Sequence, residues 1–115
     1  MFPELNITIM SGLEDGASIK CRATNGDGEQ VTNNVWCFLI GRQEDNDVCL
    51  RHDTFVSRYH AFMYWEDGQW WLEDRGSTNG TYIETDTTDT FLNERTNLLP
   101  GALFRIGRTW LRLDE

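Results

Sequence analysis

Short runs of β-branched and aromatic residues, separated by turn residues, recur along the whole chain. Runs of this kind predict β-strands, and the 3.6-residue period that marks a helix is hard to find anywhere. Residues 61–65 and 70–74, for example, flank Glu66-Asp67-Gly68, where the Asp-Gly pair predicts the tight turn of a hairpin. Many short strands at nearly regular spacing predict an all-β sandwich or barrel.

The predicted strands are distributed along the whole chain. They cover residues 5–9, 18–23, 36–40, 48–50, 61–65, 70–74, 81–83, 103–106 and 109–113. Residues 36–40 form a continuous apolar run, which predicts a strand buried on both faces. Residues 84–90 are acidic and rich in threonine, which predicts an exposed loop or a ragged hairpin.

A chain of 115 residues has the length of one domain and is too short for two ordinary ones. The three cysteines are odd in number and lack CxxC spacing, so we expect reduced thiols in or near the core, no metal site and no cofactor. No apolar run reaches the roughly 18 residues of a membrane span, and residues 1–4 lack the pattern of a signal peptide. We therefore expect a cytoplasmic protein, or a domain of a larger cytoplasmic chain, without a membrane partner.

The charge of the chain argues against nucleic acid as a partner. Its 19 acidic and 10 basic residues give a net charge of −9, whereas nucleic-acid binding depends on neutralising phosphates with Lys and Arg. Nine of the ten basic residues are arginines, and an arginine can form planar, bidentate contacts with a single phosphate group.

Three polar clusters occur in a fixed order at the ends of predicted strands. Gly41-Arg42 follows the apolar run, Val56-Ser-Arg-Tyr-His-Ala61 begins another predicted strand, and residues 74–82 read Asp-Arg-Gly-Ser-Thr-Asn-Gly-Thr-Tyr. Binding residues are concentrated in loops that a rigid scaffold carries. The clusters contain guanidinium groups, hydroxyl groups, an amide and glycines that free the backbone, which together suit a phosphate monoester.

These clusters resemble the forkhead-associated (FHA) domain family. The family's signature of Gly-Arg, then Ser-Arg-x-His, then Ser-x-Asn-Gly-Thr is met in full. Flanking positions agree as well: Asp47-Val48-x-Leu50, Trp71-x-x-Asp74, Leu99-Pro100-Gly101 and Ile106-Gly107. The resemblance extends from about residue 7 to residue 113 and implies one FHA domain over residues 1–115, folded as a β-sandwich of about eleven short strands with binding loops at one end.

The resemblance implies a non-catalytic module that binds phosphothreonine on partner proteins in signalling. It assigns Arg42 and Ser57 to the phosphate, with additional contacts from Arg58 and Thr78. Asn79 would bond the peptide backbone. Gly41, His60 and Gly80 match architectural positions that support the binding loops.

The same residues allow three other interpretations. An FHA-like domain can serve as a phosphate-independent scaffold or oligomerisation domain, although such domains usually lose the Arg or the Ser, and both are present here. Ser57 and His60 could be imagined as nucleophile and base, but on a strand they would point to opposite faces. Asp45-Asn46-Asp47 could suggest a cation site, but the EF-hand spacing is missing. Family members select the residue three places after the phosphothreonine through variable loop positions, so Phe55 would favour an apolar side chain there and Arg75 an acidic one. The oligomeric state is unknown.

Overall fold

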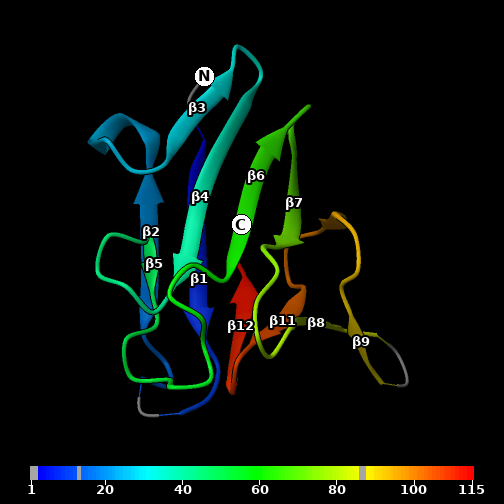
Figure 1. Ribbon diagram of the computed structural model, residues 1–115. Coiled ribbons are helices and arrows are strands. Elements are labelled where there is room, and N and C mark those ends of the chain that lie inside the picture. The colour runs from blue at the N-terminus through cyan, green and yellow to red at the C-terminus, as the bar shows by residue number, and fades with distance from the viewer. Residues whose placement is uncertain (1–2, 13, 86–87) are drawn as a thin grey trace.

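The computed structural model describes residues 3–12, 14–85 and 88–115, and it is a sandwich of two β-sheets (Figure 1). The first sheet has the order β2-β1-β12-β11-β8-β9 and contains β1 (Glu4–Ile9), β2 (Ser18–Arg22), β8 (Thr81–Glu84), β9 (Asp89–Phe91), β11 (Leu103–Ile106) and β12 (Thr109–Leu113). The second has the order β10-β7-β6-β4-β3 and contains β3 (Glu29–Thr32), β4 (Val35–Gly41), β6 (Ala61–Glu66), β7 (Gln69–Asp74) and β10 (Thr96–Leu98), with the short parallel strand β5 (Val48–Cys49) beside β4. The predicted all-β sandwich is confirmed, with twelve short strands in the described part of the chain rather than about eleven.

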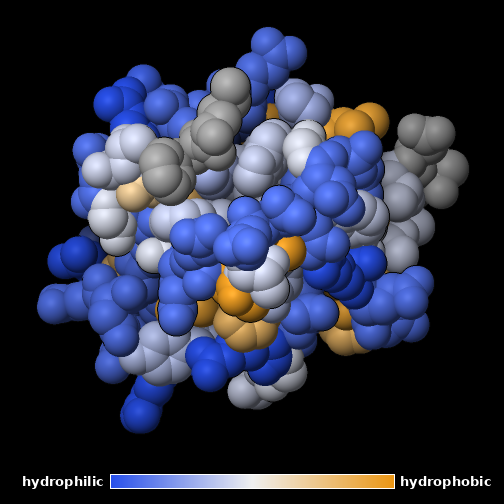
Figure 2. All heavy atoms as spheres, turned by 90° about the horizontal axis from the view of Figure 1, so that it is seen from above, coloured by the Kyte–Doolittle hydropathy of each residue, from blue (hydrophilic) through white to orange (hydrophobic). Residues whose placement is uncertain are grey.

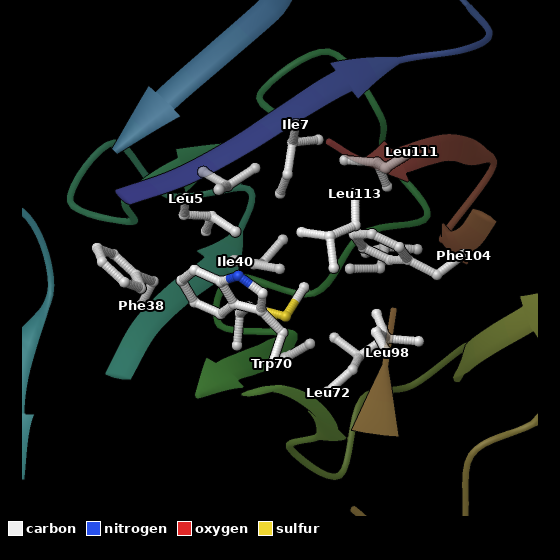
Figure 3. Packing of buried hydrophobic residues seen from close by; sticks show 14 of the residues in the cluster. Leu5, Ile7, Phe38, Ile40, Trp70, Leu72, Leu98, Phe104, Leu111 and Leu113 are labelled. Carbon is white, nitrogen blue, oxygen red and sulfur yellow. The ribbon is translucent and has the colours of Figure 1, made fainter. Parts of the chain in front are cut away.

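The core fills the space between the two sheets (Figure 3). Strand β1 alternates buried and less buried residues, so that one face carries Leu5, Ile7 and Ile9 into the core. From the opposite sheet, Phe38 and Ile40 of β4 point toward the side of the core that holds Leu5 and Ile7, and both are fully buried. Each such side chain stabilises the fold by about 1.5–3 kcal/mol relative to its exposed state. The sandwich is therefore a rigid support for the loops at its ends.

Two details of the strand predictions are wrong. Residues 36–40 are not buried on both faces, because Leu39 lies on the outer face of the second sheet and is only half-buried. Strands β3 and β10 lie in segments without a predicted strand, since all of β3 is exposed and β10 has only Leu98 in the core. A strand whose residues do not alternate between apolar and polar cannot be recognised from the sequence pattern.

The threonine-rich segment belongs to a hairpin, and the cysteines are free thiols. Strands β8 and β9 form a hairpin in which residues 84, 85 and 88–90 are exposed, as the ragged-hairpin prediction requires, while positions 86–87 lie outside the described residues. Cys21 and Cys37 are buried free thiols, and burial raises the pKa of both thiols to about 12. No helix among the described residues is long and apolar enough to cross a membrane.

The sheet register brings the predicted site residues to one end of the sandwich. Ile40 near the end of β4 pairs with Ala61 at the start of β6, which in turn pairs with Asp74 at the end of β7. The connections 42–60 and 75–80 therefore lie at the same end of the strands of the second sheet, which is the lower end in Figure 1.

Candidate functional site

An open depression lies between these two connections. Its lining contains all four residues predicted to bind phosphate, together with one tyrosine and one further arginine: Arg42, Ser57, Arg58, Tyr59, Arg75 and Thr78. We call it the loop-end depression. Three of its six residues are arginines, in a chain whose net charge is −9.

Arg42 is held at both its backbone and its side chain by residues near the other end of its own connection, 42–60. Its main-chain N–H donates to the carbonyl oxygen of Ser57 at 3.1 Å, and its Nε–H donates to the carbonyl oxygen of Val56 at 3.0 Å. A guanidinium has five N–H donors, so the four on the two Nη atoms are left over. Arg42 forms no ion pair with any described residue. The fork is therefore oriented before any ligand binds.

Ser57 and Thr78 join the two loops while keeping donors free. The main-chain N–H of Thr78 donates to the Oγ of Ser57 at 3.1 Å. A hydroxyl that accepts one hydrogen bond still has its own proton to donate. The hydroxyl of Thr78 forms no hydrogen bond with a described residue, and its side chain is exposed. Both hydroxyls can thus donate to an anion in the depression.

Asn79 ties its own loop to the segment before Ser57. Its Nδ2 donates to the carbonyl oxygen of Phe55 at 2.9 Å. The other Nδ2 hydrogen and the Oδ1 atom have no partner among the described residues. This amide can therefore donate to and accept from the backbone of a bound peptide while it remains anchored.

His60 links the two loops from beneath and is completely buried, with 0% of its surface exposed. Its Nδ1 accepts the main-chain N–H of Ser57 at 3.0 Å, so Nε2 carries the proton and donates to the carbonyl oxygen of Gly80 at 2.8 Å. Burial lowers the pKa of the imidazole, against smaller opposing effects of the Gly80 carbonyl and Asp74. The side chain is therefore neutral.

This geometry corrects the view of residues 56–61 as the start of a strand. Strand β6 begins only at Ala61, and Ser57 and His60 are in contact within a loop instead of pointing to opposite faces. Their contact still does not form a nucleophile and base. The Nδ1 lone pair is taken by the Ser57 main chain, and the Nε2 proton is directed at Gly80, away from the Ser57 hydroxyl.

Gly41 ends β4 and lies against the far end of connection 42–60, where a Cβ atom would collide with the carbonyl oxygen of Arg58. Beside it, Asn46 is 6% exposed and donates through Nδ2 to the carbonyl oxygens of Gln43 and Arg58, at 2.9 and 2.8 Å. Sequence reasoning did not assign Asn46 to the site. Its only signal was its place within Asp45-Asn46-Asp47, where the structure uses the flanking carboxylates as acceptors for Tyr59, Gly28 and Leu39.

Replacement of Gly41 by alanine is expected to destabilise the domain by about 3 kcal/mol, because the added methyl group has no space against backbone atoms. Gly76→Ala is the matched control, since Gly76 has φ +74 and open space around it. That variant should lose only about 1 kcal/mol, the cost of a left-handed alanine. Denaturant unfolding measures both, and an equal loss in the two variants would show that the contact between Gly41 and the Arg58 backbone is not tight.

Asp74 shapes the second loop. Its carboxylate accepts hydrogen bonds from the main-chain N–H of Gly76 at 2.9 Å, that of Ser77 at 3.0 Å and the hydroxyl of Thr81 at 2.7 Å. Burial alone would raise the pKa of Asp74, but the hydrogen bonds from Ser77 and Thr81 outweigh it and hold the pKa below its ordinary value. Gly80 follows with φ +85 and donates its N–H to the Ser77 hydroxyl at 2.9 Å. The loop therefore has a defined shape.

The two candidate specificity residues lie on different sides of the site. Arg75 lines the loop-end depression, with its guanidinium 5.1 Å from the centre of the Tyr59 ring. Phe55 is 40% exposed, but the guanidinium of Arg108 lies 3.7 Å from the centre of its ring. The Arg108 guanidinium thus covers the face of the Phe55 ring that an apolar side chain of the peptide would have to contact. Nothing in the sequence pattern had marked Arg108.

Comparison with known proteins identifies the family. The sequence profile described as FHA domain matches residues 38–107, so the chain belongs to the FHA domain family. Members of this family are modules that generally bind phosphothreonine peptides and are usually non-catalytic. FhaB of Mycobacterium tuberculosis is 34% identical over 87 residues, which cover 75% of this chain and 52% of FhaB. The chain thus matches about half the length of FhaB.

Solved structures share the fold. The FHA domain of the CT664 protein from Chlamydia trachomatis has a TM-score of 0.74 at 20% identity, with 98% of each chain covered. The N-terminal FHA domain of Rad53p from S. cerevisiae, solved in complex with a phosphothreonine peptide, has a TM-score of 0.72 at 18% identity, covering 97% of this chain and 93% of that domain.

Proposed function

We propose that this chain is a phosphothreonine-dependent interaction module that binds phosphorylated segments of cytoplasmic signalling proteins. One observation carries the proposal. The guanidinium of Arg42 is anchored through Nε to the Val56 carbonyl, which leaves both Nη groups unpaired in a depression that also contains the Ser57 and Thr78 hydroxyls. Anchored donors that lack an internal acceptor are what a dianionic phosphate requires.

In this proposal each site residue has a defined role in binding the ligand. Arg42 and Ser57 bind the phosphate directly, and Arg58 and Thr78 add donors from the exposed rim. Asn79 binds the peptide backbone next to the phosphothreonine. The loops that carry these side chains are supported by Gly41, His60 and Gly80.

The expected affinity is moderate. Phosphothreonine carries about −1.5 to −2 charges near neutral pH. Each hydrogen bond to a charged group contributes roughly 1.5–3 kcal/mol, so three or four reach the ~8 kcal/mol of a micromolar complex. A niche for the γ-methyl of threonine would add about 0.8 kcal/mol over serine, roughly fourfold in affinity.

Calorimetric titration tests the proposal. The domain is titrated with a pool of phosphothreonine peptides and, in parallel, with the same peptides unphosphorylated. Binding heat only with the phosphorylated pool is the expected result. A second assay treats a partner captured by the domain with a phosphatase, which should release it. A folded domain that shows no phosphate-dependent heat and keeps its dephosphorylated partner would instead be a phosphate-independent scaffold.

A further inference from the structure

A cation outside the loop-end depression lies next to the proposed peptide-binding residue. Arg108 occupies the turn between β11 and β12, is exposed, and stacks its guanidinium 3.7 Å from the centre of the Phe55 ring. We call these two residues the Phe55–Arg108 stack. The main-chain carbonyl of Phe55 is also the acceptor for Asn79, at 2.9 Å. The stack therefore adjoins the amide that would hold a peptide backbone.

The backbone beneath the stack is fixed by one carboxylate. Asp53 accepts the main-chain N–H of Arg108 at 2.7 Å through Oδ2, and the main-chain N–H of Phe55 at 2.9 Å through Oδ1. The hydroxyl of Thr109 also donates to Oδ2, at 2.7 Å. At Gly107, an added Cβ would lie 2.7 Å from a methyl carbon of Val56, so the turn is in close contact with the loop. Both residues of the stack thus have constrained positions.

The guanidinium of Arg108 has no charge partner within residues 3–12, 14–85 and 88–115. Arg108 forms no ion pair with any described residue, and the oxygens of Asp53 are used by backbone and hydroxyl donors. Stacking on a ring occupies the face of a guanidinium and leaves its N–H edges available. In a chain of net charge −9, an anchored and unpaired arginine beside the ligand site is available to bind an anion from another molecule.

We propose that Arg108, seated on Phe55, is a specificity-determining residue that selects ligands with a second anionic group close to the phosphothreonine. The group is a carboxylate side chain or a second phosphate, since the same N–H edges recognise both. An extended peptide advances about 3.3 Å per residue, so the second anion lies within a few residues of the phosphothreonine. The inference rests on the proposed function, because it needs a phosphopeptide held by Arg42 and Asn79.

The test uses a degenerate peptide library in which phosphothreonine is the only fixed residue. The wild-type chain should enrich Asp or Glu roughly fivefold at one flanking position, as expected for a partly exposed ion pair. Arg108→Gln should lose that enrichment and retain binding to phosphothreonine. Arg108→Glu should enrich Lys or Arg at the same position. Lys20→Gln, which removes one exposed positive charge from β2, is the matched control and should leave the enrichment unchanged.

A second arm distinguishes the two sources of the anion. Single peptides carry either Glu or phosphoserine at the enriched position, and their affinities are compared for the wild type and Arg108→Gln. For each peptide, the affinity of the wild type is divided by the affinity of Arg108→Gln. The peptide with the larger ratio carries the anion that Arg108 prefers. Phosphothreonine-dependent binding without acidic enrichment, or enrichment that survives Arg108→Gln, would overturn the role of Arg108. Absence of any phosphothreonine-dependent binding in the wild type would instead refute the proposed function.

Discussion

Replacement of Arg42 by alanine should reduce the affinity for a phosphothreonine peptide by about 100-fold or more. The variant loses at least two charge-assisted hydrogen bonds, each worth roughly 1.5–3 kcal/mol. Folding should be affected much less, since the structure loses a single hydrogen bond to the Val56 carbonyl, worth about 1 kcal/mol. The main effect is therefore on binding.

Calorimetric titration with one phosphothreonine peptide measures this effect, and thermal unfolding shows that each variant is folded. Arg51→Ala is the matched control, because Arg51 is exposed on the same connection and does not line the depression. Its affinity should equal that of the wild type. Arg42→Lys should have intermediate affinity, since lysine keeps the charge but loses the planar fork. Equal losses in Arg42→Ala and Arg51→Ala would indicate a general charge effect and would exclude Arg42 as the phosphate-binding residue.

The clusters that define the candidate site could be predicted because their signal is local. Gly41-Arg42 and the residues around Ser57 and Thr78 stand at strand ends, where polar side chains and glycines interrupt apolar runs. The register of β4, β6 and β7 then brings those strand ends together. Roles for individual residues stay predictions until binding is measured.

Asn46 and Arg108 could not be predicted, because their roles depend on where distant backbone atoms lie. Asn46 bonds the carbonyl of Arg58, and Arg108 is held through its main-chain N–H by Asp53. Neither contact follows from a periodic pattern. The same reasoning applies to β3, whose pairing with β4 leaves every residue exposed.

One segment connects most of these contacts. Four successive carbonyl groups accept hydrogen bonds from connection 75–80 or from the start of their own connection: Phe55 from Asn79, Val56 and Ser57 from Arg42, and Arg58 from Gln43 and Asn46. The backbone of residues 55–58 is thus held from several sides while the Ser57 hydroxyl lines the depression. His60 completes this arrangement through the Ser57 N–H. A substitution of His60 should therefore weaken the hydrogen bonds that hold the backbone around Ser57 in place.

The stability of the domain should fall as the pH drops below about 6.5, and His60 should account for a distinct part of the loss. Burial lowers the pKa of His60 in the folded state from its ordinary 6.5, so the unfolded chain binds this proton more readily. The stabilising effect is fully present above pH 6.5 and is lost as the pH falls toward the folded-state pKa, by at most about 1.4 kcal/mol per pH unit. Protonation would also put an N–H on Nδ1, opposite the N–H of Ser57, and remove their hydrogen bond.

Denaturant unfolding at pH 7.5 and pH 5.5, without phosphopeptide, isolates this effect, because a phosphate monoester itself titrates near pH 6. His60→Phe should be less stable than the wild type at pH 7.5, because the Ser57 N–H and Gly80 carbonyl lose their partner, at about 1–3 kcal/mol each. Its stability should change less between the two pH values than that of the wild type. The matched control is His52→Gln, at the exposed second histidine, and its loss of stability on acidification should exceed that of His60→Phe. If His60→Phe and the wild type lose the same free energy of unfolding on acidification, His60 is not the group whose protonation weakens the loops.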